Sequence, residues 1–344
     1  MGRPDLTPGP GLPTPNPLGC HIGNGLFRLV GMRILVAGAT GVIGRVLVPQ
    51  LVAEGHQVTA TTRDESKFAA LRSLGAQPVA VDGLDGAVVG DAVARAEPEV
   101  IIHQMTSLTG ISDIKHWDRE FALTNRLRVE GTDHLLAAAR ATGVRRVIAQ
   151  SYTGWPNIRS GGRVKSETDP LDPTPPRNQR ESLAAIRHVE RSVLNAPVEG
   201  VVLRYGTFYG GGESDELLDM IRARKLPIPG DGGAVWSWIH VEDAASATVA
   251  AVTRGSGVYN IVDDDPTPVS EMLPAIAELL GAKPPRHVPV WLARLLAGEV
   301  GVAMLTQVRG SSNAKARREL DWAPKWTTWR DGVRHELQDA VAAG

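Results

Sequence analysis

The feature that most constrains this chain is the stretch VAGATGVIG at residues 36–44, which continues an apolar run that starts at Arg33. It places three glycines at three-residue intervals between an expected strand and an expected helix. Such glycines allow a tight turn and a close approach of the backbone to a diphosphate, which the N–H groups at the helix N-terminus can bind. The alternative is a glycine-rich turn that holds no ligand. We predict a dinucleotide-binding turn made by Gly38, Thr40, Gly41, Val42, Ile43 and Gly44.

Short β-branched runs alternate with longer amphipathic stretches from Arg33 onward, which predicts βαβ units, an α/β fold and a parallel sheet. We expect strands at 33–38, 57–62, 78–82, 100–103, 146–151 and 200–206, and helices at 44–54, 65–74, 118–142 and 180–195. Beyond Tyr209 the chain mixes loops, a few strands and short helices. We therefore predict a dinucleotide-binding domain at 32–210 and a smaller substrate-binding lobe at 211–344, with some segments of the lobe returning to the first domain.

Composition limits the partners of this chain. Its 344 residues carry a formal net charge of −1, so no basic field points to nucleic acid and no polybasic run points to a lipid surface. No apolar run is long enough to span a bilayer, and the single cysteine, Cys20, excludes an internal disulfide framework. We expect a cytoplasmic protein that binds a small molecule. Residues 1–31 are rich in Pro and Gly and are predicted to form a disordered leader.

The end of the second expected strand bears on the choice of cofactor. An acidic side chain there binds a ribose 2′-hydroxyl, whereas an arginine accepts a 2′-phosphate. Arg63 favours NADP, and the adjacent Asp64 leaves NAD as the alternative. Asp82, after the third strand, is either an acceptor for the adenine amino group or only a turn residue. His103 ends the fourth strand close to where the cofactor would lie and is included as a cofactor-binding candidate, although a structural role is the alternative.

With this turn in place, several further stretches carry a resemblance to a known family. They include LTNRLRVEGTDHLLAAARATGVRRVIAQS, VVLRYGTFYGGG, WIHVEDAASA, GVYNIVDDDPTPVSEM and SNAKARRELDWAPKWTTWRDGV. Their order and spacing resemble the extended short-chain dehydrogenase/reductases of the NAD-dependent epimerase/dehydratase group, from about Met32 to about Leu337. The resemblance implies a Rossmann-type doubly wound sheet, and a C-terminal lobe that closes over a small substrate, often a nucleotide sugar. It also implies a homodimer formed through the helices at 118–142 and 180–195.

The resemblance further implies a Ser or Thr at the tip of the fifth strand, followed on the next helix by a Tyr and a Lys four residues apart. Ser151 fits the first position, but the helix at 180–195 places Ser182 and Ile186 where the Tyr and Lys belong. None of the four tyrosines in the sequence begins a Tyr-x-x-x-Lys motif. Tyr152 is a candidate replacement for the proton donor, although side chains alternate along a strand and should point away from Ser151. Ser151 and Tyr152 are therefore the predicted catalytic residues.

Three functions are compatible with this pattern. The first is an NAD(P)-dependent oxidoreductase or epimerase/dehydratase-like enzyme with a rebuilt proton path. The second is a cyclase, lyase or isomerase of secondary metabolism that retains the nucleotide as a structural part, and the third is a nucleotide-binding protein without turnover. We favour the first two together, with redox chemistry slightly ahead because the resemblance makes it the default. No metal is expected, because the nine histidines form no ligand cluster with Cys20 or with one another.

Overall fold

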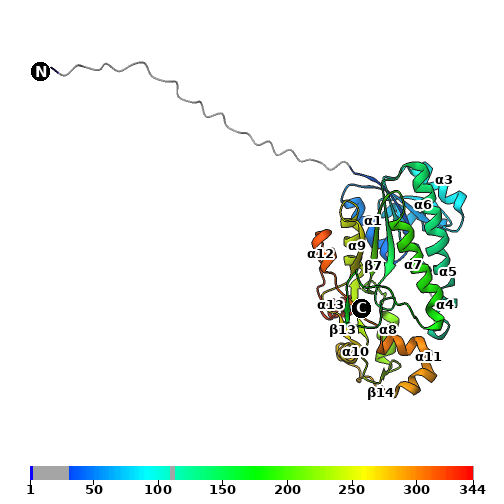
Figure 1. Cartoon of the computed structure of the whole chain (residues 1–344), viewed down its shortest axis with the longest axis vertical. Coiled ribbons are helices and arrows are strands. Elements are labelled where there is room, and N and C mark those ends of the chain that lie inside the picture. The colour runs from blue at the N-terminus through cyan, green and yellow to red at the C-terminus, as the bar shows by residue number, and fades with distance from the viewer. Residues whose placement is uncertain (3–30, 109–112, 344) are drawn as a thin grey trace. The chain divides into compact units, whose positions relative to one another are not determined.

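Seven parallel strands form the central sheet of the computed structural model, in the order β12-β7-β5-β4-β1-β2-β3 (Figure 1). The structure describes residues 1–2, 31–108 and 113–343. The strands of this sheet are β1 (Arg33–Ala37), β2 (Gln57–Thr62), β3 (Gln77–Ala80), β4 (Val100–His103), β5 (Arg146–Tyr152), β7 (Glu199–Tyr205) and β12 (Gly257–Ile261). The predicted α/β fold with a doubly wound parallel sheet is confirmed. The predicted leader at 1–31 lies outside the described residues, apart from residues 1, 2 and 31.

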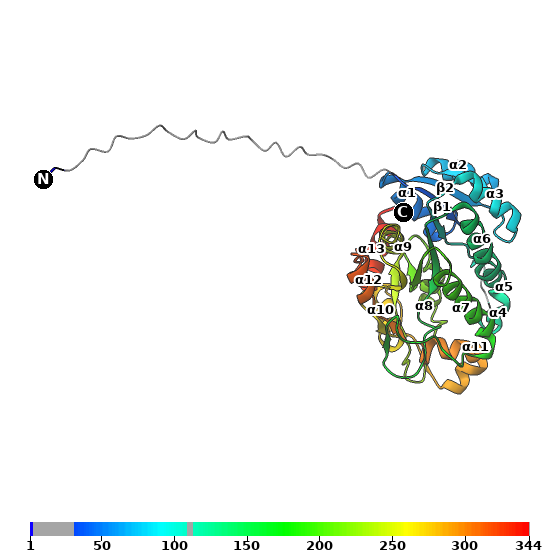
Figure 2. The same ribbon diagram turned by 45° about the horizontal axis from the view of Figure 1, so that its top comes forward.

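The described chain forms thirteen α-helices, several of which cover the two faces of the sheet. They are α1 (Val42–Ala53), α2 (Phe68–Ser73), α3 (Gly86–Ala96), α4 (Trp117–Glu120), α5 (Ala122–Arg126), α6 (Thr132–Thr142), α7 (Arg180–Leu194), α8 (Asp215–Arg222), α9 (Val241–Ala251), α10 (Val269–Leu279), α11 (Val290–Thr306), α12 (Ala314–Glu319) and α13 (Trp329–Ala343). Alternate residues of β1 point to opposite faces of the sheet, and the residues on both faces are apolar. Ile34 and Val36 pack in one apolar core with α1 and α9, while Leu35 and Ala37 pack in a second core with α3, α6 and α7. Figure 2 shows α6 and α7 together on one side of the molecule and α1 and α9 on the other.

The order of the strands reverses next to β1. The chain passes from β1 outward to β2 and β3, and then returns to the other side of β1 with β4 and β5. In open α/β sheets the loops at such a reversal diverge, and the crevice between them is where ligands bind. The carboxyl ends of β1 and β4 therefore mark the position of the candidate site.

Short strand pairs and helices build a smaller lobe at one end of the sheet, around α8, α10 and α11 (Figure 1). The short strands are β6 (Val164–Lys165), β8 (Thr207–Tyr209), β9 (Ile228–Pro229), β10 (Val235–Trp236), β11 (Trp238–His240), β13 (Thr267–Pro268), β14 (His287–Val288) and β15 (Gly310–Ser311). Strand β12, from the C-terminal part of the chain, joins the edge of the main sheet beside β7. The division into 32–210 and 211–344 stays a prediction.

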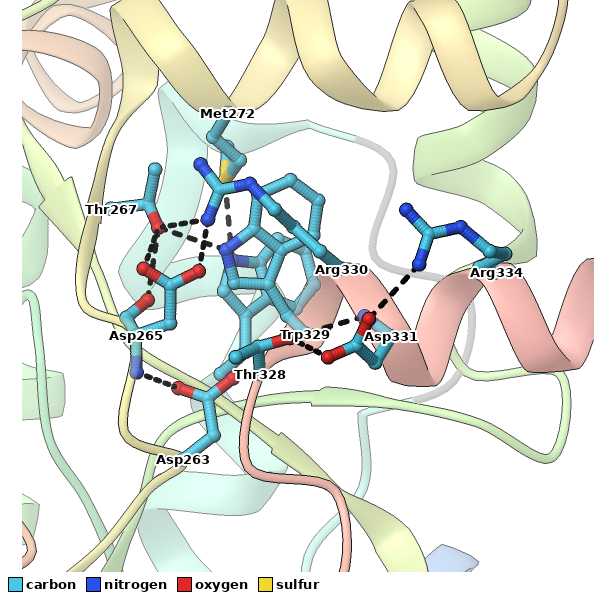
Figure 3. A network of polar contacts seen from close by, with 10 residues as sticks. Asp263, Asp265, Thr267, Met272, Thr328, Trp329, Arg330, Asp331 and Arg334 are labelled. Carbon is cyan, nitrogen blue, oxygen red and sulfur yellow. Dashed lines mark hydrogen bonds and ion pairs between the residues drawn. The ribbon is translucent and has the colours of Figure 1, made fainter.

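A buried polar network helps to hold this lobe together (Figure 3). Trp329 is fully buried, and its indole Nε1 donates a hydrogen bond to Thr267 Oγ1 at 2.8 Å. Asp265 pairs with Arg330, and its backbone N–H donates to Asp263 Oδ1 at 3.2 Å. Burial raises the pKa of Asp263 from its usual 3.8 to about 8, although the backbone N–H of Asp265 opposes this rise. The carboxyl group of Asp263 is therefore mostly protonated at neutral pH.

The segment expected to form one helix at 118–142 is interrupted in the structure. Phe121 separates α4 from α5 with non-helical backbone angles, and a π-helical turn at Leu127–Gly131 separates α5 from α6. A π-helical turn accommodates one extra residue and changes the direction of the side chains that follow. The hydrophobic periodicity of the sequence indicated a helix here but not these breaks.

Candidate functional site

The turn between β1 and α1 uses its three glycines for different reasons. Gly38 has φ +90°, and a Cβ atom there would lie 2.8 Å from the carbonyl carbon of Gln104. A Cβ atom at Gly44 would lie 2.4 Å from the carbonyl oxygen of Ala39. At Gly41 the nearest atom would be 3.4 Å away, so the protein itself leaves room there. Gly38 and Gly44 are thus required by the fold, whereas the absent side chain of Gly41 keeps the turn open.

The N-terminus of α1 faces this open space. Gly41 is its N-cap residue, and no side chain caps the helix or places a negative charge in its first turn. Helix α1 therefore presents its first N–H groups and the positive end of its dipole to a ligand. Two hollows of about 230 and 160 Å³ share this region. Of the predicted residues, Gly38, Gly41 and Arg63 line both hollows, Thr40 lines the smaller, and Val42, Ile43 and Gly44 line the larger.

Arg63 and Asp64, at the end of β2, play different parts in the structure. Arg63 is exposed and has no hydrogen-bond or ion-pair partner in the described part of the chain. Asp64 caps the short 3-10 helix at Glu65–Lys67, because its Oδ1 atom accepts the N–H of Ser66 at 2.9 Å. Hydrogen bonds from Ser66 lower the pKa of the Asp64 carboxyl group. The arginine is thus available to a ligand, whereas the carboxylate already has a structural role.

Asp82 and His103 both form local bonds. Asp82 is exposed, and its Oδ1 atom accepts the N–H of Leu84 at 3.0 Å in a turn. His103 is 4% exposed and lies 3.1 Å from Thr132 Oγ1 through Nε2, while its Nδ1 atom accepts the N–H of Met105 at 3.2 Å. Burial lowers the pKa of His103 to about 4, with a smaller contribution from a nearby arginine, so the ring is neutral. Neither side chain lines the two hollows, and their roles in cofactor binding stay predictions.

Ser151 belongs to a closed network of buried charges. Its hydroxyl group donates to Glu190 Oε1 at 2.8 Å, and Arg204 binds both oxygens of the same carboxylate at 2.7 and 2.6 Å. Arg204 and Glu190 are 6% and 7% exposed. Loss of one partner from such a pair costs about 3–5 kcal/mol of stability, because it leaves the other charge uncompensated. Ser151 thus faces α7 and connects it to β5 and β7.

Tyr152 points to a different set of neighbours, as the alternation along β5 predicts. Its hydroxyl group lies 3.0 Å from Thr207 Oγ1, and its ring lies 6.5 Å from the ring of Trp155. Burial raises the pKa of Tyr152, while the bond with Thr207 and the charge of Arg128 oppose the rise. The phenol is therefore protonated at neutral pH. The structure does not bring Ser151 and Tyr152 together.

At the start of α7, Ser182 and Ile186 occupy the positions where the resemblance places the Tyr and the Lys. Ser182 is fully buried, donates to Asp118 Oδ1 at 2.7 Å and accepts from Asn125 Nδ2 at 3.1 Å. Asp118 also accepts the backbone N–H groups of Glu181 and Ser182, so it caps α7 from α4. Ile186 is fully buried in the core of the smaller lobe. The serine is held in structural bonds, and the isoleucine fills a packing position.

Residues that were not predicted from the sequence also line this region, and four of them bear on its chemistry or shape. Gln104 lines both hollows, whereas Gln150, Phe208 and Glu213 line the larger one. Gln104 donates from Nε2 to the Tyr205 hydroxyl at 2.9 Å, and its buried Oε1 atom has no hydrogen-bond partner among the described residues. Burial raises the pKa of Glu213. Gln104 and Gln150 sit at carboxyl strand ends, a signal in the sequence that could have found them; no such signal marks Phe208 or Glu213.

The crevice has the features that a nicotinamide dinucleotide needs. The opening above Gly41, the uncapped start of α1, the exposed Arg63 and the unpaired oxygen of Gln104 offer sites for phosphate, ribose and amide groups. Among the described residues, no His, Cys, Asp or Glu cluster is arranged to hold a metal ion. Within the same part of the chain, no helix is both long and apolar enough to cross a membrane.

Comparison with known proteins identifies the family. The model of the NAD dependent epimerase/dehydratase family matches residues 34–262, and the chain belongs to this family. A 3-diazoavenalumate denitrifying reductase from Streptomyces sp. is 42% identical over 312 residues, which cover 89% of this chain and 100% of that protein. UDP-glucose 4-epimerase of Mycolicibacterium smegmatis is 30% identical over 313 residues, covering 86% of this chain and 94% of the relative.

A solved structure agrees with the fold. The UDP-glucose 4-epimerase of Thermus thermophilus, in complex with NAD, aligns with a TM-score of 0.65 and 24% identity over 88% of this chain and 97% of that one. The predicted membership of the extended dehydrogenase/reductases is confirmed, as is the predicted enzyme class. The chain is an NAD(P)-dependent enzyme of the oxidoreductase and epimerase type.

Proposed function

We propose that this enzyme is an NADPH-dependent reductase that acts on the diazo group of an aromatic carboxylic acid. The observation that carries the proposal is the contrast between the open crevice at the glycine turn and the start of α7, where Ser182 and Ile186 are held in structural contacts. Ser182 is occupied by Asp118 and Asn125, and Ile186 is packed in the core. A carbonyl acceptor needs a proton as well as a hydride, so an acceptor that needs only hydride suits this site better.

A diazo group in its diazonium form is such an acceptor. Addition of hydride to the diazonium carbon forms a C–H bond, and the C–N bond breaks as dinitrogen leaves with its electron pair. The balance is ArN₂⁺ + H⁻ → ArH + N₂, with no proton taken from the enzyme. The relative from Streptomyces sp. is described as a denitrifying reductase for a diazo compound, and the alignment covers the whole of that protein. This similarity supports the same class of acceptor here.

The residues of the crevice have distinct roles in this proposal. The nicotinamide cofactor supplies the hydride when it is bound. Gly41 and the start of α1 hold the diphosphate, and Arg63 binds the 2′-phosphate, which is why we propose NADP rather than NAD. His103 and Asp82 support the walls: His103 fixes the loop after β4 through the N–H of Met105, and Asp82 shapes the turn after β3.

The predicted catalytic pair divides into two roles. Ser151 is a positioning residue in this proposal, because its hydroxyl group is committed to Glu190. Tyr152 is proposed to contact the substrate as a neutral hydrogen-bond donor, and the raised pKa of its phenol supports that state. No proton transfer from Tyr152 is needed to balance the reaction.

Aromatic side chains next to Tyr152 support a flat acceptor. The rings of Trp155 and Trp117 meet edge to face at 5.5 Å, and Trp117 stacks on Phe121 at 4.4 Å. All three side chains are largely buried in an apolar core, and the edges that stay exposed favour planar apolar groups. We also propose a cytoplasmic homodimer, supported only by the single cysteine and by the family resemblance of the helices α4–α7.

The test uses purified enzyme, NADPH and a carboxybenzenediazonium salt whose two nitrogens are isotopically labelled. We expect enzyme-dependent loss of the reduced nicotinamide absorbance, matched mole for mole by labelled dinitrogen and by benzoate. Reactions without enzyme correct for direct reduction of the salt. Oxidation of NADPH by ketones or sugar nucleotides, with none above background for the diazonium compound, would contradict the proposal.

A further inference from the structure

Arg128 is a buried cation with no hydrogen-bond or ion-pair partner in the described part of the chain. It lies in the π-helical turn Leu127–Gly131 and is 5% exposed. Its Nε and Nη1 atoms are buried, and neither has a hydrogen-bond partner among the described residues. Burial lowers its pKa to about 10, so the guanidinium group is still charged at neutral pH. An unpaired charge in the interior destabilises a fold, and an anion bound beside Arg128 would offset this cost.

The neighbours of Arg128 place it beneath the ends of β4 and β5. Thr124, one turn earlier in the chain, exchanges hydrogen bonds of 2.9 and 2.8 Å with the backbone of Ser107. Thr132, one turn later, bonds to His103 at the end of β4. The charge of Arg128 also lowers the pKa of His103 and opposes the rise in the pKa of Tyr152. Arg128 therefore lies behind the loop that lines the crevice.

The surroundings of Arg128 favour a carboxylate that is attached to an aromatic ring. At the end of β5, Tyr152 leads into an aromatic group formed by Trp155, Trp117 and Phe121. The cofactor diphosphate has its own site at the glycine turn on β1, on a different strand. A guanidinium group presents parallel N–H donors that match the two oxygens of a carboxylate. An aromatic ring against the tryptophans would bring an attached carboxylate toward this charge.

We propose that Arg128 is the receptor for the carboxylate of the aromatic substrate and selects acids over their neutral analogues. The assignment rests on the proposed function for the class of substrate, but its test does not require turnover. Arg128 is a binding and specificity residue, and it holds the ring so that the group to be reduced faces the crevice. Because no described residue pairs with Nε or Nη1 of Arg128, the folded protein is less stable when no anion is bound.

The experiment measures calorimetric binding of cinnamate and of cinnamamide to the enzyme saturated with NADP⁺. Wild type should bind cinnamate at least about tenfold more tightly than the amide, the effect expected for one buried charge-assisted contact. Arg128→Met should remove this preference, and Arg128→Lys should reduce it. Arg126→Met is the matched control, because Arg126 is exposed and pairs with Glu130 at 2.7 Å; it should bind like wild type.

Urea unfolding distinguishes a ligand-binding role of Arg128 from a structural role. Because no group of the described chain pairs with Nε or Nη1 of Arg128, Arg128→Met should unfold at an equal or higher urea concentration than wild type. A marked loss of stability in Arg128→Met, equal binding of cinnamate and cinnamamide by wild type, or an unchanged preference in both variants would each overturn the assignment. If Arg128→Met does not fold, it counts as such a loss.

Reductase assays keep the two proposals distinguishable. An enzyme that binds cinnamate through Arg128 but never oxidises NADPH with a diazonium acid would refute only the proposed function. Full reduction of carboxybenzenediazonium by Arg128→Met, with an unchanged KM for the acid, would refute only the role of Arg128. A rise in KM for the acid, with little change for benzenediazonium, which lacks the carboxylate, supports both.

Discussion

Replacing Arg63 by glutamine tests how this enzyme chooses its cofactor. The side chain is exposed, lines both hollows at the end of β2 and has no partner in the described chain, so the substitution removes no contact that the fold needs. A hydrogen bond to a charged group contributes about 1.5–3 kcal/mol. Because solvent screens an exposed pair, the lower end of this range applies. About 1.5 kcal/mol corresponds to roughly tenfold weaker binding of NADP⁺.

The affinity for NAD⁺ should stay nearly constant in Arg63→Gln, because NAD⁺ has no 2′-phosphate to lose a partner. Isothermal titration of both nucleotides into both proteins gives the ratio directly. Asp64→Asn is the matched control, since asparagine also caps helices and the Asp64 side chain is turned toward Ser66. Raised ionic strength should shrink the preference of wild type for NADP⁺. Equal losses of affinity for NADP⁺ and NAD⁺ in Arg63→Gln would contradict a contact between Arg63 and the 2′-phosphate.

Two further predictions concern the turn and the smaller lobe. Gly41→Val should leave the chain folded, because a Cβ atom there meets only Gly38 O at 3.4 Å, but should abolish nucleotide binding in titration calorimetry; undiminished affinity would contradict the crevice. Asp263 has a folded pKa of about 8 against 3.8 when unfolded, so the folded state retains a proton that the unfolded state loses between these values. Unfolding free energy should fall by up to about 1.4 kcal/mol per pH unit from pH ~4 to ~8. Asp263→Asn should reduce this pH dependence of the unfolding free energy, measured by urea titration at several pH values. An unchanged pH dependence would contradict the prediction.

The main sheet could be predicted from local sequence because buried parallel strands are short runs of β-branched residues with recognisable boundaries. The runs beginning at Arg33, Gln57 and Val100 correspond to β1, β2 and β4 almost to the residue. The glycine turn was equally visible, since strand, turn and helix follow one another in the chain. The separate structural needs of Gly38 and Gly44 emerge only once Gln104 and Ala39 are seen packed against them.

The catalytic end of the site depends on contacts between distant segments. Asp118 caps α7 across more than sixty positions of sequence, and Glu190 holds Ser151 from the middle of the same helix. Neither bond has a local signature, so a serine at a strand tip looked available for chemistry. Arg128 was not selected either, because burial of an arginine at a π-helical turn reflects the surrounding tertiary structure and not its own sequence pattern.

The most direct test of the central claim follows the hydrogen itself. NADPH carrying deuterium at the transferable position of the nicotinamide is supplied to wild-type enzyme with carboxybenzenediazonium, and the benzoate formed is analysed by mass spectrometry. Direct hydride transfer should place one deuterium atom on the ring carbon that lost dinitrogen, and none when unlabelled NADPH is used in heavy water. Benzoate that takes this hydrogen from solvent, or that forms without oxidation of the nucleotide, would contradict a crevice built to deliver hydride without a proton.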